Sequence, residues 1–121
     1  MSLEIAILAP VLLVLVFTIV QAGLWFHARN LAQAAAQEGA TAAASYTATP
    51  TSGVTRARAF LSEQAGDSLS ATTVSTAGST PTLVRVQVTG RALSVLPGVP
   101  GMTVTQTAFV PVERFTSDGT P

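Results

Sequence analysis

The feature that most constrains this chain is an uncharged apolar run close to its start. Residues 5–26 read IAILAPVLLVLVFTIVQAGLWF and contain no Asp, Glu, Lys or Arg. About 20 such residues are enough for one helix to cross the hydrocarbon core of a bilayer. The aromatic residues at the far end, Trp25 and Phe26, are of the kind that favours the headgroup layer. The run therefore predicts a transmembrane helix over residues 5–26.

A cleaved secretory signal is the alternative interpretation of this run. Such a signal starts with a basic region and has an apolar core of about 7–15 residues. No Lys or Arg precedes the run here, and the run is longer than that core. Small residues within positions 31–34, which follow the run, keep the alternative open.

The helical pattern continues beyond the predicted membrane segment. Residues 27–46 are rich in alanine, the strongest helix former, and no helix breaker comes before Thr49 and Pro50. The chain thus predicts one helix of about 45 residues, or ~70 Å, within residues 1–48. Alanine recurs at every fourth position of its outer half, at Ala28, Ala32, Ala36, Ala40 and Ala44. Because small residues four apart let helices approach closely, we predict that this row packs against partner helices or against the chain's own domain. The plainer alternative is that alanine is common in helices.

Two residues of the apolar helix are unexpected in a simple anchor. Glu4 is a carboxylate at the membrane boundary, where an unpaired charge costs free energy. It is either a headgroup-layer residue favoured by the helix dipole or the partner of a cation on a neighbouring subunit. Pro10 removes one backbone hydrogen bond and predicts a kink that neighbours would compensate. We predict that both serve assembly.

The remaining residues, 49–121, show the pattern of a small α+β domain. A polar linker is predicted at residues 47–53, and apolar residues at helical spacing predict a second helix over residues 54–66. Alternating apolar residues then predict three antiparallel strands, over residues 71–76, 82–89 and 102–110. The two prolines and two glycines of residues 96–101 predict a loop, Pro111 marks a sheet edge, and the tail 116–121 is expected to be loose.

Composition argues against several classes of function. The formal net charge is zero, which gives no electrostatic attraction for nucleic acid. Cysteine is absent, so no thiolate metal site or disulfide exists, and His27 is the only histidine. We interpret His27 as an interfacial residue and the acid pair Glu63 and Asp67 as a solvated helix face. We therefore expect no enzyme activity, no cofactor and no metal.

The N-terminal sequence resembles a known family. Residues 2–44, SLEIAILAPVLLVLVFTIVQAGLWFHARNLAQAAAQEGATAAA, are similar to the start of TadE-like proteins, pilin-like or pseudopilin components of the tight-adherence (Flp) pilus system. The acid in S-L-E, the early proline in L-A-P, the apolar span and the alanine-rich stretch with E-G carry the resemblance. More loosely, Val112 and Glu113 look like the end of the family's last strand.

The resemblance implies processing. Such proteins are made with a basic leader that ends in glycine, and a prepilin peptidase removes it so that the acid falls near mature position five. Glu4 stands one place early, so we expect translation to begin upstream and cleavage to occur near Met1 or Ser2. The basic leader would also hold the N-terminus in the cytoplasm, although Arg29 by itself favours the opposite orientation.

We therefore expect a structural subunit, a pseudopilin or minor pilin, in the bacterial cell membrane with its C-terminal domain extracytoplasmic. Its expected partners are the lipid bilayer, other pilin-like subunits, pilus assembly membrane proteins and the prepilin peptidase. The alternative is a single-pass anchored binding or adhesion module outside any pilus. A soluble fragment 47–121 with saturable ligand binding would distinguish that alternative.

Overall fold

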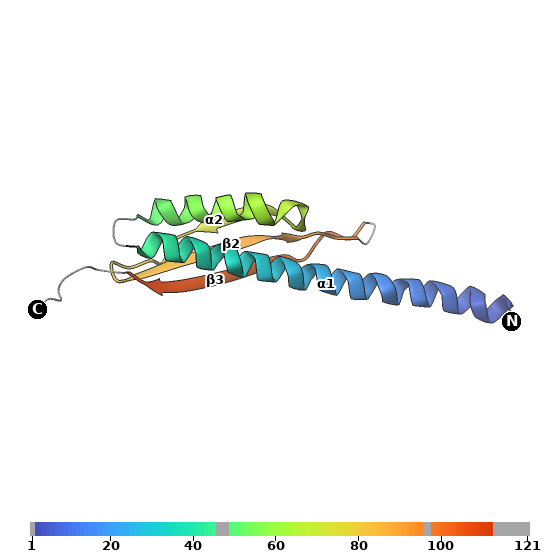
Figure 1. Ribbon diagram of the computed structural model, residues 1–121. Helices are drawn as coiled ribbons and strands as arrows, with labels where there is room; N and C mark the ends of the chain where they lie inside the picture. Colours follow the sequence, from blue (N-terminus) through green and yellow to red (C-terminus); the bar gives the residue numbers. More distant parts are fainter. Residues whose placement is uncertain (1, 46–48, 96–97, 113–121) are drawn as a thin grey trace, which may run out of the picture.

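Two helices and a three-stranded antiparallel sheet make up the chain, as the α+β prediction requires (Figure 1). The computed structural model describes residues 2–45, 49–95 and 98–112. The elements in chain order are α1 (Ser2–Ala44), α2 (Pro50–Gln64), the 3-10 turn η1 (Gly66–Ser68), β1 (Leu69–Ser75), β2 (Leu83–Ala92) and β3 (Thr103–Pro111). The predicted tail 116–121 and Glu113 lie outside the described residues.

The helix α1 is continuous over 43 residues, which corresponds to about 65 Å. Pro10 lies inside it without interrupting it. The helix ends at Ala44 rather than at residue 48, so the predicted N-terminal element was slightly too long.

The second helix begins four residues earlier than predicted. Thr49 is its N-cap: the Thr49 hydroxyl accepts from the Ser52 amide at 3.4 Å, and the Ser52 hydroxyl accepts from the Thr49 amide at 3.4 Å. Pro50 occupies the first helical position, where a missing amide hydrogen costs nothing. The predicted linker 47–53 is therefore largely a helix start, because the proline that looked like a breaker is a favoured first residue.

The sheet has the order β1-β2-β3, with β2 in the centre and β3 at an edge. Val84, Val86 and Val88 alternate to one face and are buried, as their spacing predicts. The pairing of β1 with β2 is irregular between Ser70 and Thr73, where Ala71 has a φ of 51°. This bulge was not predicted, since nothing in an alanine marks a left-handed backbone.

The core lies where the outer half of α1 contacts α2 on one side and the sheet on the other (Figure 1). The largest fully buried side chains are only Val86 and Val88, so backbones approach closely. A Cβ atom added at Gly39 would lie 2.7 Å from the Gly53 carbonyl oxygen, and one added at Gly53 would lie 2.7 Å from the Ala43 Cβ. The two glycines therefore allow α1 and α2 to approach closely at this point.

The division predicted at residue 48 stays a prediction, but the packing core extends across it. Residues of α1 from Ala28 to Ala44 belong to the buried core of the C-terminal domain. A fragment that starts at residue 47 would lack one wall of that core, so it is not a suitable test of independent binding. The folded unit begins inside α1.

The contact between Gly39 and Gly53 gives a direct test of the packing. Gly39→Ala places a methyl group against the Gly53 carbonyl, and we expect a loss of about 1–2 kcal/mol after the gain in helix propensity is subtracted. The measurement is urea unfolding of the full chain in non-ionic micelles, followed by pulse proteolysis. Gly23→Ala is the matched control, because nothing lies within 4 Å of its added Cβ. Equal stability of the two variants would contradict this account of the interface.

Candidate functional site

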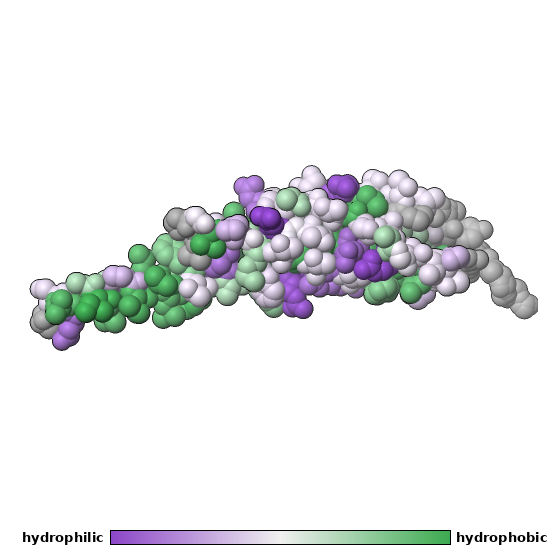
Figure 2. Space-filling model, turned by 180° about the vertical axis from the view of Figure 1, so that it is seen from behind, coloured by the Kyte–Doolittle hydropathy of each residue, from purple (hydrophilic) through white to green (hydrophobic). Residues whose placement is uncertain are grey.

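The first half of α1 projects from the folded domain without cover. Every described residue from Ser2 to Val20 is exposed, and most are large and apolar. Figure 2 shows this half as a green projection. By length and composition α1 is long and apolar enough to cross a membrane, and none of its most apolar 18-residue window is buried. A contiguous apolar surface of this size calls for lipid or other helices around it.

Glu4 lies in the first turn of this exposed half. Within residues 2–45, 49–95 and 98–112 it has no ion-pair or hydrogen-bond partner. The ion pair found in those ranges joins Arg56 of α2 to Glu38 of α1 at 2.8 Å. It lies in the folded half of the chain, which comprises α1 from Ala28 onwards, α2 and the sheet. The arginine nearest to Glu4 along α1 is Arg29, about 37 Å away by helical rise, and His27 lies only two residues closer. A cation that neutralises Glu4 therefore has to come from outside the described residues.

Pro10 lies on the same exposed half, two turns from Glu4. Because proline has no amide hydrogen, the carbonyl of Ala6 lacks its usual partner within the helix. The role predicted for Pro10 in assembly stays a prediction.

The alanine row packs against the chain's own domain, which is one of the two arrangements predicted for it. The five alanines at positions 28, 32, 36, 40 and 44 are buried within their own chain, at 0–2% exposure. Of the two uses that small residues allow, the structure shows packing against the chain's own domain. The row is consequently not available to another subunit while the domain is folded. We therefore do not propose that these alanines contact another subunit, because α2 and the sheet already cover them.

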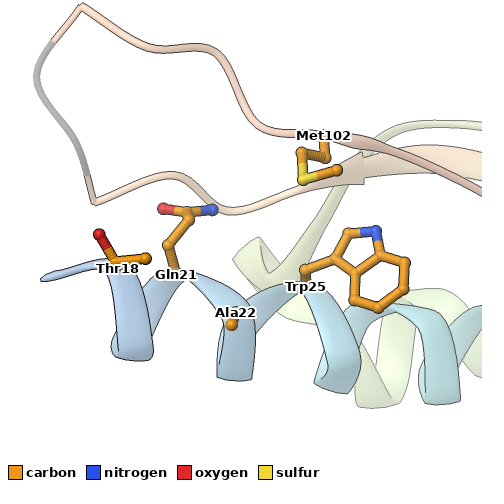
Figure 3. Close-up of a pocket in the computed structure, with 5 residues that line it drawn as sticks. All are labelled: Thr18, Gln21, Ala22, Trp25 and Met102. Carbon is orange, nitrogen blue, oxygen red and sulfur yellow. The ribbon is translucent and has the colours of Figure 1, made fainter. Parts of the chain in front are cut away.

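The boundary between the exposed and buried halves carries a contact that the sequence did not reveal. The side chain of Gln21 donates from Nε2 to the Leu93 carbonyl at 3.0 Å and accepts at Oε1 from the Val95 amide at 2.9 Å. Both partners belong to the loop between β2 and β3. Figure 3 shows Gln21 pointing from α1 towards this loop. A glutamine within an apolar span was the available signal, since such a side chain needs a hydrogen-bonding partner.

A shallow pocket lies beside Gln21, lined by Thr18, Gln21, Ala22, Trp25 and Met102 (Figure 3). Its walls are almost entirely apolar, so it offers no group that could perform chemistry. One turn further along α1, the Arg29 guanidinium lies 5.8 Å from the centre of the Trp25 ring. A cation over an aromatic face is a common arrangement at a membrane surface.

The described residues do not gather a metal site. Among them, no group of three or more His, Cys, Asp or Glu side chains could hold an ion. His27 is exposed on α1. Glu63 lies on α2, whereas Asp67 lies in η1 beyond the helix end, so the predicted acid pair does not share one helix face.

Comparison with known proteins supports the resemblance at the N-terminus. A family model described as TadE-like protein matches residues 1–41. This confirms the resemblance read from the acid, the early proline and the alanine-rich stretch. Comparisons with curated proteins and with solved structures found no significant match.

The two hydrogen bonds of Gln21 can be tested directly. Gln21→Leu removes both bonds, and we expect the Val95 amide to exchange its hydrogen roughly 30-fold faster, for a loss of about 2 kcal/mol. The measurement is amide hydrogen exchange by NMR on the full chain in micelles. Gln37→Leu, an exposed glutamine on the same helix, is the control. An unchanged Val95 exchange rate in Gln21→Leu would contradict the contact.

Proposed function

We propose that this chain, whose residues 1–41 match the TadE-like family, is a structural pilin-like subunit of a tight-adherence type IV pilus system. It would act as a pseudopilin or minor pilin that assembles through the first half of α1. The supporting observation is that this half is exposed and apolar, has Glu4 in its first turn, and lies within the family match over residues 1–41. The N-terminal apolar helix suggests membrane anchoring.

The exposed half of α1 suits a subunit whose helix is surrounded by lipid before assembly and by other helices afterwards. Its aliphatic side chains can face acyl chains before assembly and similar helices afterwards. Little hydrophobic free energy separates the two environments, so specificity has to come from polar groups. Glu4 is such a group, because its charge is costly in either apolar setting unless a cation lies next to it.

The partner proposed for Glu4 is the N-terminal amine of a neighbouring subunit or another cation. Such a pair fixes the axial register between two helices that otherwise slide freely on apolar surfaces. In this proposal the folded half, from about residue 28 onwards, lies outside the cytoplasmic membrane. The prepilin peptidase, other pilin-like subunits and assembly membrane proteins are the proposed partners, and no enzyme activity is proposed.

Substitution of Glu4 tests the register pair. Glu4→Gln and Glu4→Ala remove the charge without touching the folded half, so we expect incorporation into the assembly to be lost while membrane insertion persists. Sheared pili and membranes are assayed separately with an antibody against the folded domain. Glu38→Gln is the matched control, since it removes a carboxylate whose ion pair lies on the exterior of the folded half. Assembly of the Glu4 variants at the normal level would rule out the pair.

The mature N-terminus provides a second test. We expect the intact mass of the protein from its native membrane to show cleavage just before Met1 or Ser2. The new terminus should disappear in cells that lack the prepilin peptidase. The same mass with and without the peptidase would leave a simple anchored domain.

One observation favours the alternative of an anchored binding module. The helices cover one face of the sheet, and the alternation of burial along β2 leaves the other face open. On that face Arg85 pairs in register with Phe109, which is 56% exposed. Saturable ligand binding by the full chain in micelles, lost on Phe109→Ala, would support this alternative. Dependence of assembly on Glu4 would support the pilin-like subunit.

A further inference from the structure

The described residues of the loop between β2 and β3, 93–95 and 98–102, lie beside α1 where its exposed half begins. In Figure 1 the coloured strand ends that lead into this loop extend past the end of α2, on the side of α1. Gln21 holds it there through the Leu93 carbonyl and the Val95 amide. Met102 lines a pocket with Thr18 and Trp25 of α1. The loop is therefore level with residues that were predicted to lie in the membrane.

The composition of the loop is unusual for a turn at the end of a soluble sheet. Residues 93–102 read LSVLPGVPGM and contain no charge. Leu93, Val99 and Met102 are 41%, 50% and 58% exposed. At the opposite end of the sheet, the turn between β1 and β2 reads TAGSTPT, which is mostly small and polar. Among the described residues beyond α1, Leu93, Val99 and Met102 thus gather at the end of the domain that adjoins the exposed half of α1, whereas Phe109, the other large exposed apolar residue, lies on β3.

If α1 spans a membrane as proposed, the position of the loop also implies bounds for the membrane segment that differ from the predicted residues 5–26. Irregular backbone cannot lie in lipid hydrocarbon, because its amide and carbonyl groups would lose their hydrogen bonds. The loop backbone that Gln21 contacts must consequently lie at or outside the hydrocarbon boundary. That leaves residues 3–20 as the span, about 18 residues or ~27 Å, which is still long enough. Trp25 and Arg29 then fall in the headgroup layer, which suits an aromatic ring under a guanidinium.

We propose that the described part of this loop, residues 93–95 and 98–102, is a second membrane contact of this chain. Its exposed apolar side chains Leu93, Val99 and Met102 insert at the boundary between headgroups and acyl chains, in the leaflet from which α1 emerges. The proposal rests on the membrane anchoring proposed above. Because the loop is uncharged, the contact needs no anionic lipid and does not weaken with salt.

The chain contains no cysteine, so a fluorescent probe attached to a single introduced cysteine labels that position alone. Val99→Cys carries a fluorescent probe in the loop. Ala77→Cys carries it in the exposed turn at the opposite end of the sheet, and Leu12→Cys carries it in the middle of the span. The full chain is reconstituted in phosphatidylcholine vesicles at a low protein-to-lipid ratio. Nitroxides attached to lipids, either at the headgroup or along the acyl chain, then quench each probe according to its depth.

We expect the probe at Val99 to be quenched several-fold more than the probe at Ala77. Its quenching should be strongest for nitroxides near the headgroup and unchanged between low and high salt. Quenching at Val99 no greater than at Ala77, with Leu12 deeply quenched, would overturn the loop contact and leave the anchoring intact. Loss of quenching at Leu12 as well would overturn the anchoring itself.

A second copy of the chain is the competing occupant of the loop surface. In that case the probe at Val99 would be shielded only at high protein-to-lipid ratios, and lipid nitroxides would not reach it, which would also overturn the proposal. Val99→Asp provides an independent variant. With a probe at Met102→Cys, it should reduce lipid quenching at position 102, whereas Ala77→Asp should leave it unchanged.

Discussion

Close packing of the small-residue face of α1 holds the folded half of this chain together. Gly39 lies against the Gly53 carbonyl, and the buried alanines on both sides of it have no room for larger side chains. Because the core contains few bulky residues, its stability depends on short distances between backbones rather than on large buried areas. A rigid contact of this kind fixes the direction of α1 relative to the sheet. Because α1 is continuous from Ser2 to Ala44, its exposed half points in the same direction.

The first half of α1 is exposed and its second half is packed in the core, and the residue composition changes between the two. Large aliphatic residues up to Val20 present the broad surface that lipid or neighbouring helices require. From Ala28 onwards alanine allows α2 and the sheet to approach. Between them, Gln21 satisfies two backbone groups of a loop more than 70 residues away in sequence. The transition therefore takes about two turns of helix and needs no hinge.

Local patterns were enough to predict most of the fold. The apolar run and the alanine-rich stretch predicted α1, and the alternating apolar residues, such as the valines of β2, predicted the antiparallel sheet. The start of α2 was missed because Pro50 was interpreted by its general effect on helices rather than by its favourable first position. The bulge at Ala71 has no marker in the sequence.

The site was harder to predict, for physical reasons. Small residues four apart indicate close packing but do not say whether the partner is another subunit or the same chain, and here it is the same chain. The contact between Gln21 and the loop joins residues brought together only by the antiparallel sheet, so sequence spacing could not reveal it. Glu4 differs, because its position in an exposed apolar half follows from the sequence and from the fold alike.

An apolar helix in lipid can rotate about its axis and slide along it at little cost, so an ordered assembly has to limit both motions. In the proposed subunit a charge near one end, Glu4, limits sliding, since it is neutralised at only one axial position. A side contact limits rotation, and the described part of the loop between β2 and β3 provides one, because Gln21 attaches Leu93 and Val95 to a single face of α1. The rigid small-residue core then transmits both restraints to the sheet. Each subunit would present its folded half to its neighbours in a fixed orientation before any contact between the domains forms.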